Sequence, residues 1–140
     1  SLTANASSAT TDAGPLSIAL SLSATDSLDV TKTESKIIDV TETHGILWQA
    51  DHYTASGASG TDGAFVYIKN TSSNAAHEIA IGHGTAAHIL GAGNAVRLMT
   101  LKGEEFAFFP WDCTQNIVYD ANGSYTGALE SWIFVRTGTA

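Results

Sequence analysis

The stretch EFAFFPW, residues 105–111, holds four of the twelve aromatic side chains of the chain within six positions. In a β-strand, successive side chains point to opposite faces. Phe109 and Trp111 would therefore lie on one face of this strand, and Phe106 and Phe108 on the other. Both faces would need cover, because a contiguous aromatic patch in water marks an interaction site. The segment is expected to be a strand with two buried faces.

One face of this strand can pack into a core, and the other face has three possible covers. The first is the N-terminal segment of the same chain, and the second is a neighbouring subunit. The third is a sugar stacked on the rings, which needs exposed and coplanar rings and is disfavoured by their alternation between faces. Pro110 has no N–H for a sheet ladder, so the strand is expected at a sheet edge or to end near this residue.

The rest of the chain carries the same two-residue period. In PLSIALSLS, residues 15–23, apolar side chains alternate with small or polar ones, which is typical of a half-buried strand. Further strand-like runs lie at residues 28–33, 36–42, 45–50, 64–70, 77–83, 86–90, 95–102, 105–111, 116–121 and 129–137. Gly, Asn, Asp or Ser stands in nearly every gap between them. Short strands at this spacing predict a single all-β sandwich, similar to a jelly roll.

The domain organisation follows from where the pattern begins. Residues 1–14 are small, polar and unpatterned, and are expected to form a flexible N-terminal arm. Residues 15–140 are expected to form the β-sandwich domain. A chain of 140 residues can bury a core of its own, and Cys113 as the only cysteine leaves no intrachain disulfide to support it.

The charge balance disfavours several classes of partner. The chain carries a net charge of −8, and its six basic residues are scattered singly. Nucleic-acid binding depends on clustered cations that neutralise phosphates, so neither nucleic acid nor an anionic membrane is expected as a partner. No apolar run reaches the length of a membrane span, and no signal-peptide pattern opens the sequence, so we expect synthesis in a cytosol.

One connection is long and rich in small residues: DHYTASGASGTDG, residues 51–63. Loops of this length are often functional. Asp51, His52 and Tyr53 are therefore candidates for a contact loop, with a tolerated insertion as the equal alternative.

The sequence predicts no catalytic, cofactor or metal site. His77, His83 and His88 are close in sequence, but their spacing differs from the H-x-H pair of cupin metal sites. The stretch DANGS, residues 120–124, lacks the Gly and Glu positions of a calcium loop and is better explained as a turn. No nucleophile elbow, P-loop or dinucleotide motif is present, so the chain is not expected to be an enzyme.

Three segments resemble a known group of proteins: AFVYIKNTSSNAAHEIAIG (64–82), RLMTLKGEEFAFFPW (97–111) and ALESWIFVRT (128–137). They are similar to segments of small virion structural proteins of tailed bacteriophages, particularly marine ones. The resemblance implies a non-enzymatic β-sandwich located in the virion. Its partners would be further copies of itself, as a homo-oligomer, and other virion proteins such as the major capsid protein. A capsid decoration (cement) protein is the first choice, and a tail or head-fibre component is the alternative.

A different class of function stays open. A carbohydrate-binding or adhesive β-sandwich module could use Trp48, Tyr53 and the 51–63 loop as its contact surface. The two classes differ in what Phe109 and Trp111 touch. A subunit interface buries these rings in the oligomer, whereas a sugar-binding module brings a ligand to them.

Overall fold

The structure is a computed structural model, which describes residues 3–6, 18–21, 30–41, 44–53, 63–84, 89, 95–121 and 125–136. These residues form strands and one short 3-10 helix. The elements are β1 (Thr3–Ala6), β2 (Ile18–Ser21), β3 (Val30–Thr41), β4 (His44–Trp48), η1 (Ala50–His52), β5 (Ala64–Asn70), β6 (Ile79–His83), β7 (Val96–Leu101), β8 (Phe106–Trp111), β9 (Ile117–Ala121) and β10 (Thr126–Arg136).

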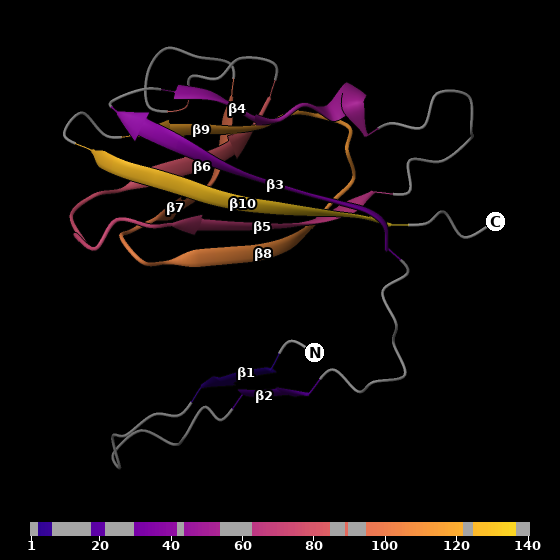
Figure 1. The fold of residues 1–140 in the computed structure, drawn as a ribbon, viewed down its shortest axis with the longest axis horizontal. Coiled ribbons are helices and arrows are strands. Elements are labelled where there is room, and N and C mark those ends of the chain that lie inside the picture. Colours follow the sequence, from indigo (N-terminus) through magenta and orange to yellow (C-terminus); the bar gives the residue numbers. More distant parts are fainter. Residues whose placement is uncertain are drawn as a thin grey trace.

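Two antiparallel four-stranded sheets pack face to face (Figure 1). The first sheet has the order β3-β10-β5-β8, and the second has the order β4-β9-β6-β7. From β3 onward the chain passes back and forth between the sheets, and β10 returns to lie beside β3. Eight strands in this order form a jelly roll. The predicted all-β, jelly-roll-like sandwich is confirmed.

Some predicted strands differ from the observed ones. The runs at 28–33 and 36–42 are parts of one long strand, β3, which pairs along its length with β10. Of the run at 86–90, only Ile89 belongs to the described residues. β1 lies inside the segment predicted as an arm, and it pairs with β2 in a separate two-stranded sheet. Among the described residues, the two four-stranded sheets are made of strands from β3 onward, and residues 7–17 and 22–29 lie outside the described residues.

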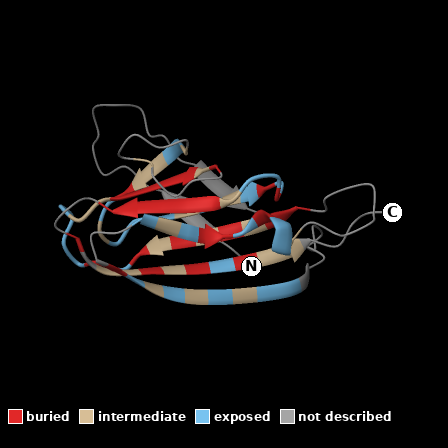
Figure 2. Ribbon diagram, turned by 90° about the horizontal axis from the view of Figure 1, so that it is seen from above, coloured by how far each residue is buried: buried red, intermediate tan, exposed pale blue. Residues whose placement is uncertain are grey.

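The core lies between the two sheets, and residues coloured as buried occur on strands of both sheets (Figure 2). In β5 the inward residues Val66 and Ile68 are fully buried, while Tyr67 between them points outward and is only partly buried, as the two-residue period predicts. A polar link joins the layers. Trp48 Nε1 donates to Ser131 Oγ at 2.8 Å, and this hydroxyl donates to the backbone oxygen of Tyr67 at 2.8 Å.

Asn70, at the end of β5, holds one end of the sandwich together. Its side chain is fully buried and makes four hydrogen bonds. Nδ2 donates to the backbone oxygens of His77 (2.9 Å) and Leu101 (3.1 Å), and Oδ1 accepts from the Ser72 N–H (3.1 Å) and the Tyr125 hydroxyl (2.7 Å). Four is the full capacity of an amide side chain, so the network is closed.

Candidate functional site

The aromatic strand β8 lies at the edge of the first sheet, as Pro110 predicts, and divides its rings between two faces. Trp111 points inward and is 7% exposed, and Phe109 packs against the core beside it. Phe106 and Phe108 point outward and are 60% and 38% exposed. The predicted alternation is present. In the part of the chain that the structure describes, Phe106 and Phe108 keep an exposed surface, and cover by the N-terminal segment or by a second chain stays a prediction.

The outward side chains of β8 belong to a larger aromatic surface. We call it the outer aromatic face and define it by the residues that strand register places in three rows across the first sheet. These residues are Thr33, Phe134, Phe65 and Pro110 in the first row, Ser35, Trp132, Tyr67 and Phe108 in the second, and Ile37, Glu130, Lys69 and Phe106 in the third. Six of the chain's twelve aromatic residues lie here.

The rings of the outer aromatic face contact one another across strands. Phe65 and Phe108 stack almost in parallel, with centroids 5.5 Å apart and planes 5° apart. Phe108 also meets the edge of Phe134 at 6.4 Å, and Tyr67 lies 5.8 Å from Phe106. Because the rings of β8 alternate between its two faces, the sequence disfavoured a platform of exposed, coplanar rings. The coplanar pair instead comes from two neighbouring strands.

The outer aromatic face is nearly free of charge, although the chain carries −8. Its two charged residues, Lys69 and Glu130, are direct cross-strand partners of opposite sign. Three rows of side chains on four strands span roughly 400 Å² at the usual spacings of a sheet. Ile37, at 73% exposed, extends the apolar surface onto the edge strand β3. An apolar surface of this size on a folded domain is often an interaction site.

The three residues proposed as a contact loop lie in different environments. Asp51 and His52, in η1, are exposed. Tyr53 is half-buried, and its ring lies between Trp48 (5.9 Å) and Trp111 (5.8 Å). Tyr53 thus contributes to packing, and Trp48, at 1% exposed, offers no surface to a sugar. Residues 54–62 of the loop lie outside the described residues.

The hydroxyl of Tyr53 connects η1 to the edge strand β3. It donates a hydrogen bond to Glu34, whose carboxylate also pairs with Lys32. Burial, followed by this hydrogen bond, raises the pKa of Tyr53 above its usual range. The hydrogen bonds from Lys32 and Tyr53 lower the pKa of Glu34. Lys36 closes the same edge of the sandwich, with its ammonium 3.9 Å from the ring centroid of Trp48.

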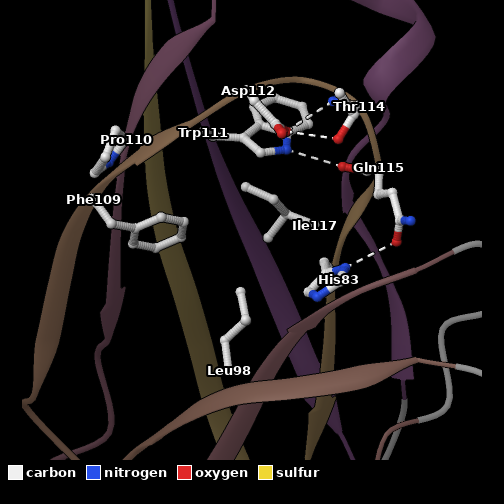
Figure 3. Close-up of a pocket in the computed structure, with 9 residues that line it drawn as sticks. All are labelled: His83, Leu98, Phe109, Pro110, Trp111, Asp112, Thr114, Gln115 and Ile117. Carbon is white, nitrogen blue, oxygen red and sulfur yellow. Dashed lines mark hydrogen bonds between the residues drawn. The ribbon is translucent and has the colours of Figure 1, made fainter.

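A pocket of about 440 Å³ opens between the sheets, where β8 and β7 are their edge strands (Figure 3). We call it the edge pocket. It is lined by His83, Leu98, Phe109, Pro110, Trp111, Asp112, Thr114, Gln115 and Ile117. Phe109, Leu98 and Ile117 point into a common space, and the polar side chains form the rim. Its volume lies within the usual range for small-molecule sites.

The turn between β8 and β9 gives the edge pocket a fixed rim. The Thr114 N–H and hydroxyl both donate to Asp112 Oδ1, at 3.0 and 2.8 Å. Trp111 Nε1 donates to the backbone oxygen of Gln115 at 2.9 Å. Cys113, buried at the centre of the turn, has a positive φ of 58°, which is uncommon for a residue with a side chain. No sequence motif pointed to this pocket.

The histidines singled out in the sequence have separate contacts. His77 Nδ1 bonds to Ser72 Oγ at 2.9 Å, and His83 Nδ1 donates to Gln115 Oε1 at 2.8 Å. His88 lies outside the described residues. Among the residues that the structure describes, no three of His, Cys, Asp and Glu are grouped so that they could hold a metal ion. Within the same residues, no helix is long and apolar enough to cross a membrane.

Comparison of the chain with protein-family models, with curated protein sequences and with solved structures gives no match in any of the three.

Proposed function

We propose that this chain is a non-enzymatic structural protein of a virion, in first place a decoration protein of a tailed-bacteriophage capsid. In this proposal it assembles by burying the outer aromatic face against a second copy of itself. The observation that carries the proposal is the concentration of six aromatic side chains on one face of a sheet, with Phe106 60% exposed. Without such cover, Phe106, Phe108 and Trp132 would stay exposed to water.

The charge distribution favours a second copy as the occupant. Two chains of charge −8 repel each other over most of their surfaces. The outer aromatic face balances one cation against one anion, so two copies can approach through it without that repulsion. In a two-fold contact the same patch lies on both sides, and Lys69 and Glu130 supply opposite charges to the facing copy.

The size of the face bears on how strong one contact can be. A standard protein interface buries about 800 Å² on each partner, about twice the roughly 400 Å² of this face. A single contact of this size is expected to be weak. On a particle, many weak contacts act together and give stable attachment. This combination suits a subunit that assembles on a shell or fibre.

Two further points support the virion class. The jelly roll is an architecture used by viral capsid domains, although it also serves lectins and cupins, so the fold alone does not assign a function. The resemblance of residues 64–82, 97–111 and 128–137 to small phage virion proteins is the second point.

The test uses particles of the virus whose genome encodes the chain, purified from an infected culture. Peptides of the chain should co-purify with intact particles through a density gradient, and antibodies against it should label the capsid. Labelling of the tail would move the assignment to a tail or head-fibre component. Finding the chain only in the particle-free fraction would contradict a virion role.

A further inference from the structure

The edge pocket has one apolar side. Phe109 from β8, Leu98 from β7 and Ile117 from β9 face the same space, so the two sheets contribute to one wall (Figure 3). Leu98, one of the residues that line the pocket, is 49% exposed. When the apolar face of a ligand covers an apolar wall that is accessible to solvent, the burial contributes favourably to the free energy of binding.

The opposite side of the edge pocket carries hydrogen-bonding groups with unused capacity. His83 uses Nδ1 to donate to Gln115 Oε1, which leaves Nε2 as an acceptor and the Gln115 Nε2 group as a donor. Asp112 receives both Thr114 donors on Oδ1, which leaves Oδ2 to accept. Among the residues that the structure describes, His83 Nε2 and the Gln115 Nε2 group have no other hydrogen-bond partner, whereas the Asp112 carboxylate also accepts from its own backbone N–H. Hydrogen-bond donors and acceptors are therefore both present among the residues that line the pocket.

We propose that the edge pocket binds a neutral saccharide ring. A pyranose has an apolar C–H face, which fits against Phe109 and Leu98, and hydroxyl groups at its rim. Each hydroxyl both donates and accepts, so a set of neighbouring hydroxyls can satisfy the acceptors Asp112 Oδ2 and His83 Nε2 together with the donor Gln115 Nε2. A ligand without an apolar face would leave the wall in water. A ligand without hydroxyl groups would leave the polar rim unpaired.

Charge selects a neutral ligand over an anionic one. The hydrogen bonds from Thr114 lower the pKa of Asp112, so its carboxylate is ionised at neutral pH. The chain as a whole is also strongly negative. Phosphorylated or carboxylated ligands would be repelled by both.

The site needs little rearrangement before it binds. The turn that carries Asp112 and Gln115 is fixed by the Asp112–Thr114 bonds and by the bond from Trp111 Nε1 to the Gln115 backbone. A preformed rim lowers the entropic cost of binding. The edge pocket and the outer aromatic face share Pro110, but their other residues differ, so saccharide binding and self-association can be tested with separate variants.

The three indole N–H groups of the chain provide an internal control for a binding test by nuclear magnetic resonance. Trp111 lines the edge pocket, Trp132 lies on the outer aromatic face, and Trp48 lies in the core. The probes are methyl α-glucopyranoside, methyl α-mannopyranoside and methyl β-galactopyranoside, each titrated into ¹⁵N-labelled protein. At least one should shift the Trp111 indole signal in a saturable way and leave the other two indole signals in place.

Variants then test the assigned contacts. Gln115→Ala and His83→Ala should each weaken binding about three- to tenfold, the loss of one hydrogen bond, without changing the fold. Gln115→Ala keeps the backbone oxygen that accepts from Trp111. Gln49→Ala removes an exposed glutamine that does not line the pocket and should bind like the wild type.

Four results would overturn the proposal. The first is no shift of the Trp111 signal with any of the three glycosides at their highest soluble concentration. The second is a shift of Trp132 in place of Trp111, which would move the sugar site to the outer aromatic face. The third is a Gln115→Ala variant with unchanged affinity. Adenosine serves as a competing class of ligand, and saturable binding of adenosine without any glycoside response would also contradict the proposal.

Discussion

Replacing Phe108 by serine should separate association from folding. Phe108 lies in the central row of the outer aromatic face and is 38% exposed in the single chain. A phenylalanine presents about 200 Å², so about 80 Å² of Phe108 remains to be covered by a second copy. At about 25 cal/mol per Å² this cover is worth about 2 kcal/mol for each copy, and about 4 kcal/mol for a two-fold contact. Phe108→Ser should therefore weaken dimerisation about a thousandfold.

The same substitution also removes contacts within the chain. Phe108 stacks on Phe65 and meets the edge of Phe134, and such aromatic pairs are worth about 0.5–1.5 kcal/mol each. Thermal unfolding of dilute protein measures this loss of stability. Sedimentation velocity over a concentration series then measures the association constant of the folded variant.

Two further variants make the result decisive. Phe106→Ser removes a ring that is 60% exposed, so it should weaken association while changing the stability of the single chain less than Phe108→Ser does. Ile46→Ser removes a side chain of similar exposure, 41%, on β4 in the other sheet, and should leave association unchanged. If Phe106→Ser and Phe108→Ser both fold and associate like the wild type, the outer aromatic face is not the contact surface.

The remaining predictions concern the fold and one titration. Asn70→Ala should lower the free energy of unfolding by about 3 kcal/mol or more, because it leaves several buried hydrogen-bond partners unpaired. Asn74→Ala, on the exposed turn, should lower it by less than about 1 kcal/mol. Chemical denaturation compares the two variants. Gly82→Ala should destabilise by at least about 2 kcal/mol in the same assay, because its Cβ would lie 2.4 Å from a backbone oxygen of β7, and a wild-type midpoint would contradict that close packing. Tyr53→Phe removes a donor to Glu34, so the lowered pKa of Glu34 should rise toward its ordinary value in a ¹³C titration. A carboxyl group whose pKa is lower in the folded state stabilises the fold at a pH above its unfolded-state pKa, and this stabilisation is lost as the pH falls through its folded-state pKa. The variant should therefore lose less stability on acidification than the wild type. An unchanged Glu34 titration midpoint would count against the hydrogen bond.

The local pattern of the sequence was sufficient to predict β8 and its two faces. The alternation of Phe106, Phe108 and Phe109 requires only the two-residue period of a strand, and Pro110 indicated an edge. The same reasoning predicted β5 with its observed bounds, because its apolar run ends in clear turn residues.

The outer aromatic face could not be predicted in this way. Its rings come from positions 65, 67, 106, 108, 132 and 134, and only the pairing register of three strands places them together. A shift of the register by one residue would move every ring of a strand to the other face. The stacking of Phe65 on Phe108 depends on the same register, so a pattern within one strand gives no information about it.

The edge pocket and the position of Tyr53 depend on loop geometry. The left-handed backbone at Cys113 and the capped turn around it bring Gln115 back toward His83, and neither follows from residue type. Tyr53 lies in a segment that reads as a polar loop, yet its ring packs between two tryptophans from different strands. Such contacts depend on the path of the chain between strands, which has no sequence period.

The molar mass of the wild-type chain in solution shows whether the outer aromatic face is buried against a second copy. Light scattering after size exclusion should be measured over a dilution series that reaches the highest soluble concentration. We expect 14.6 kDa for the dilute chain and a rise toward twice this mass as the concentration increases. A mass of 14.6 kDa at every concentration would contradict this expectation.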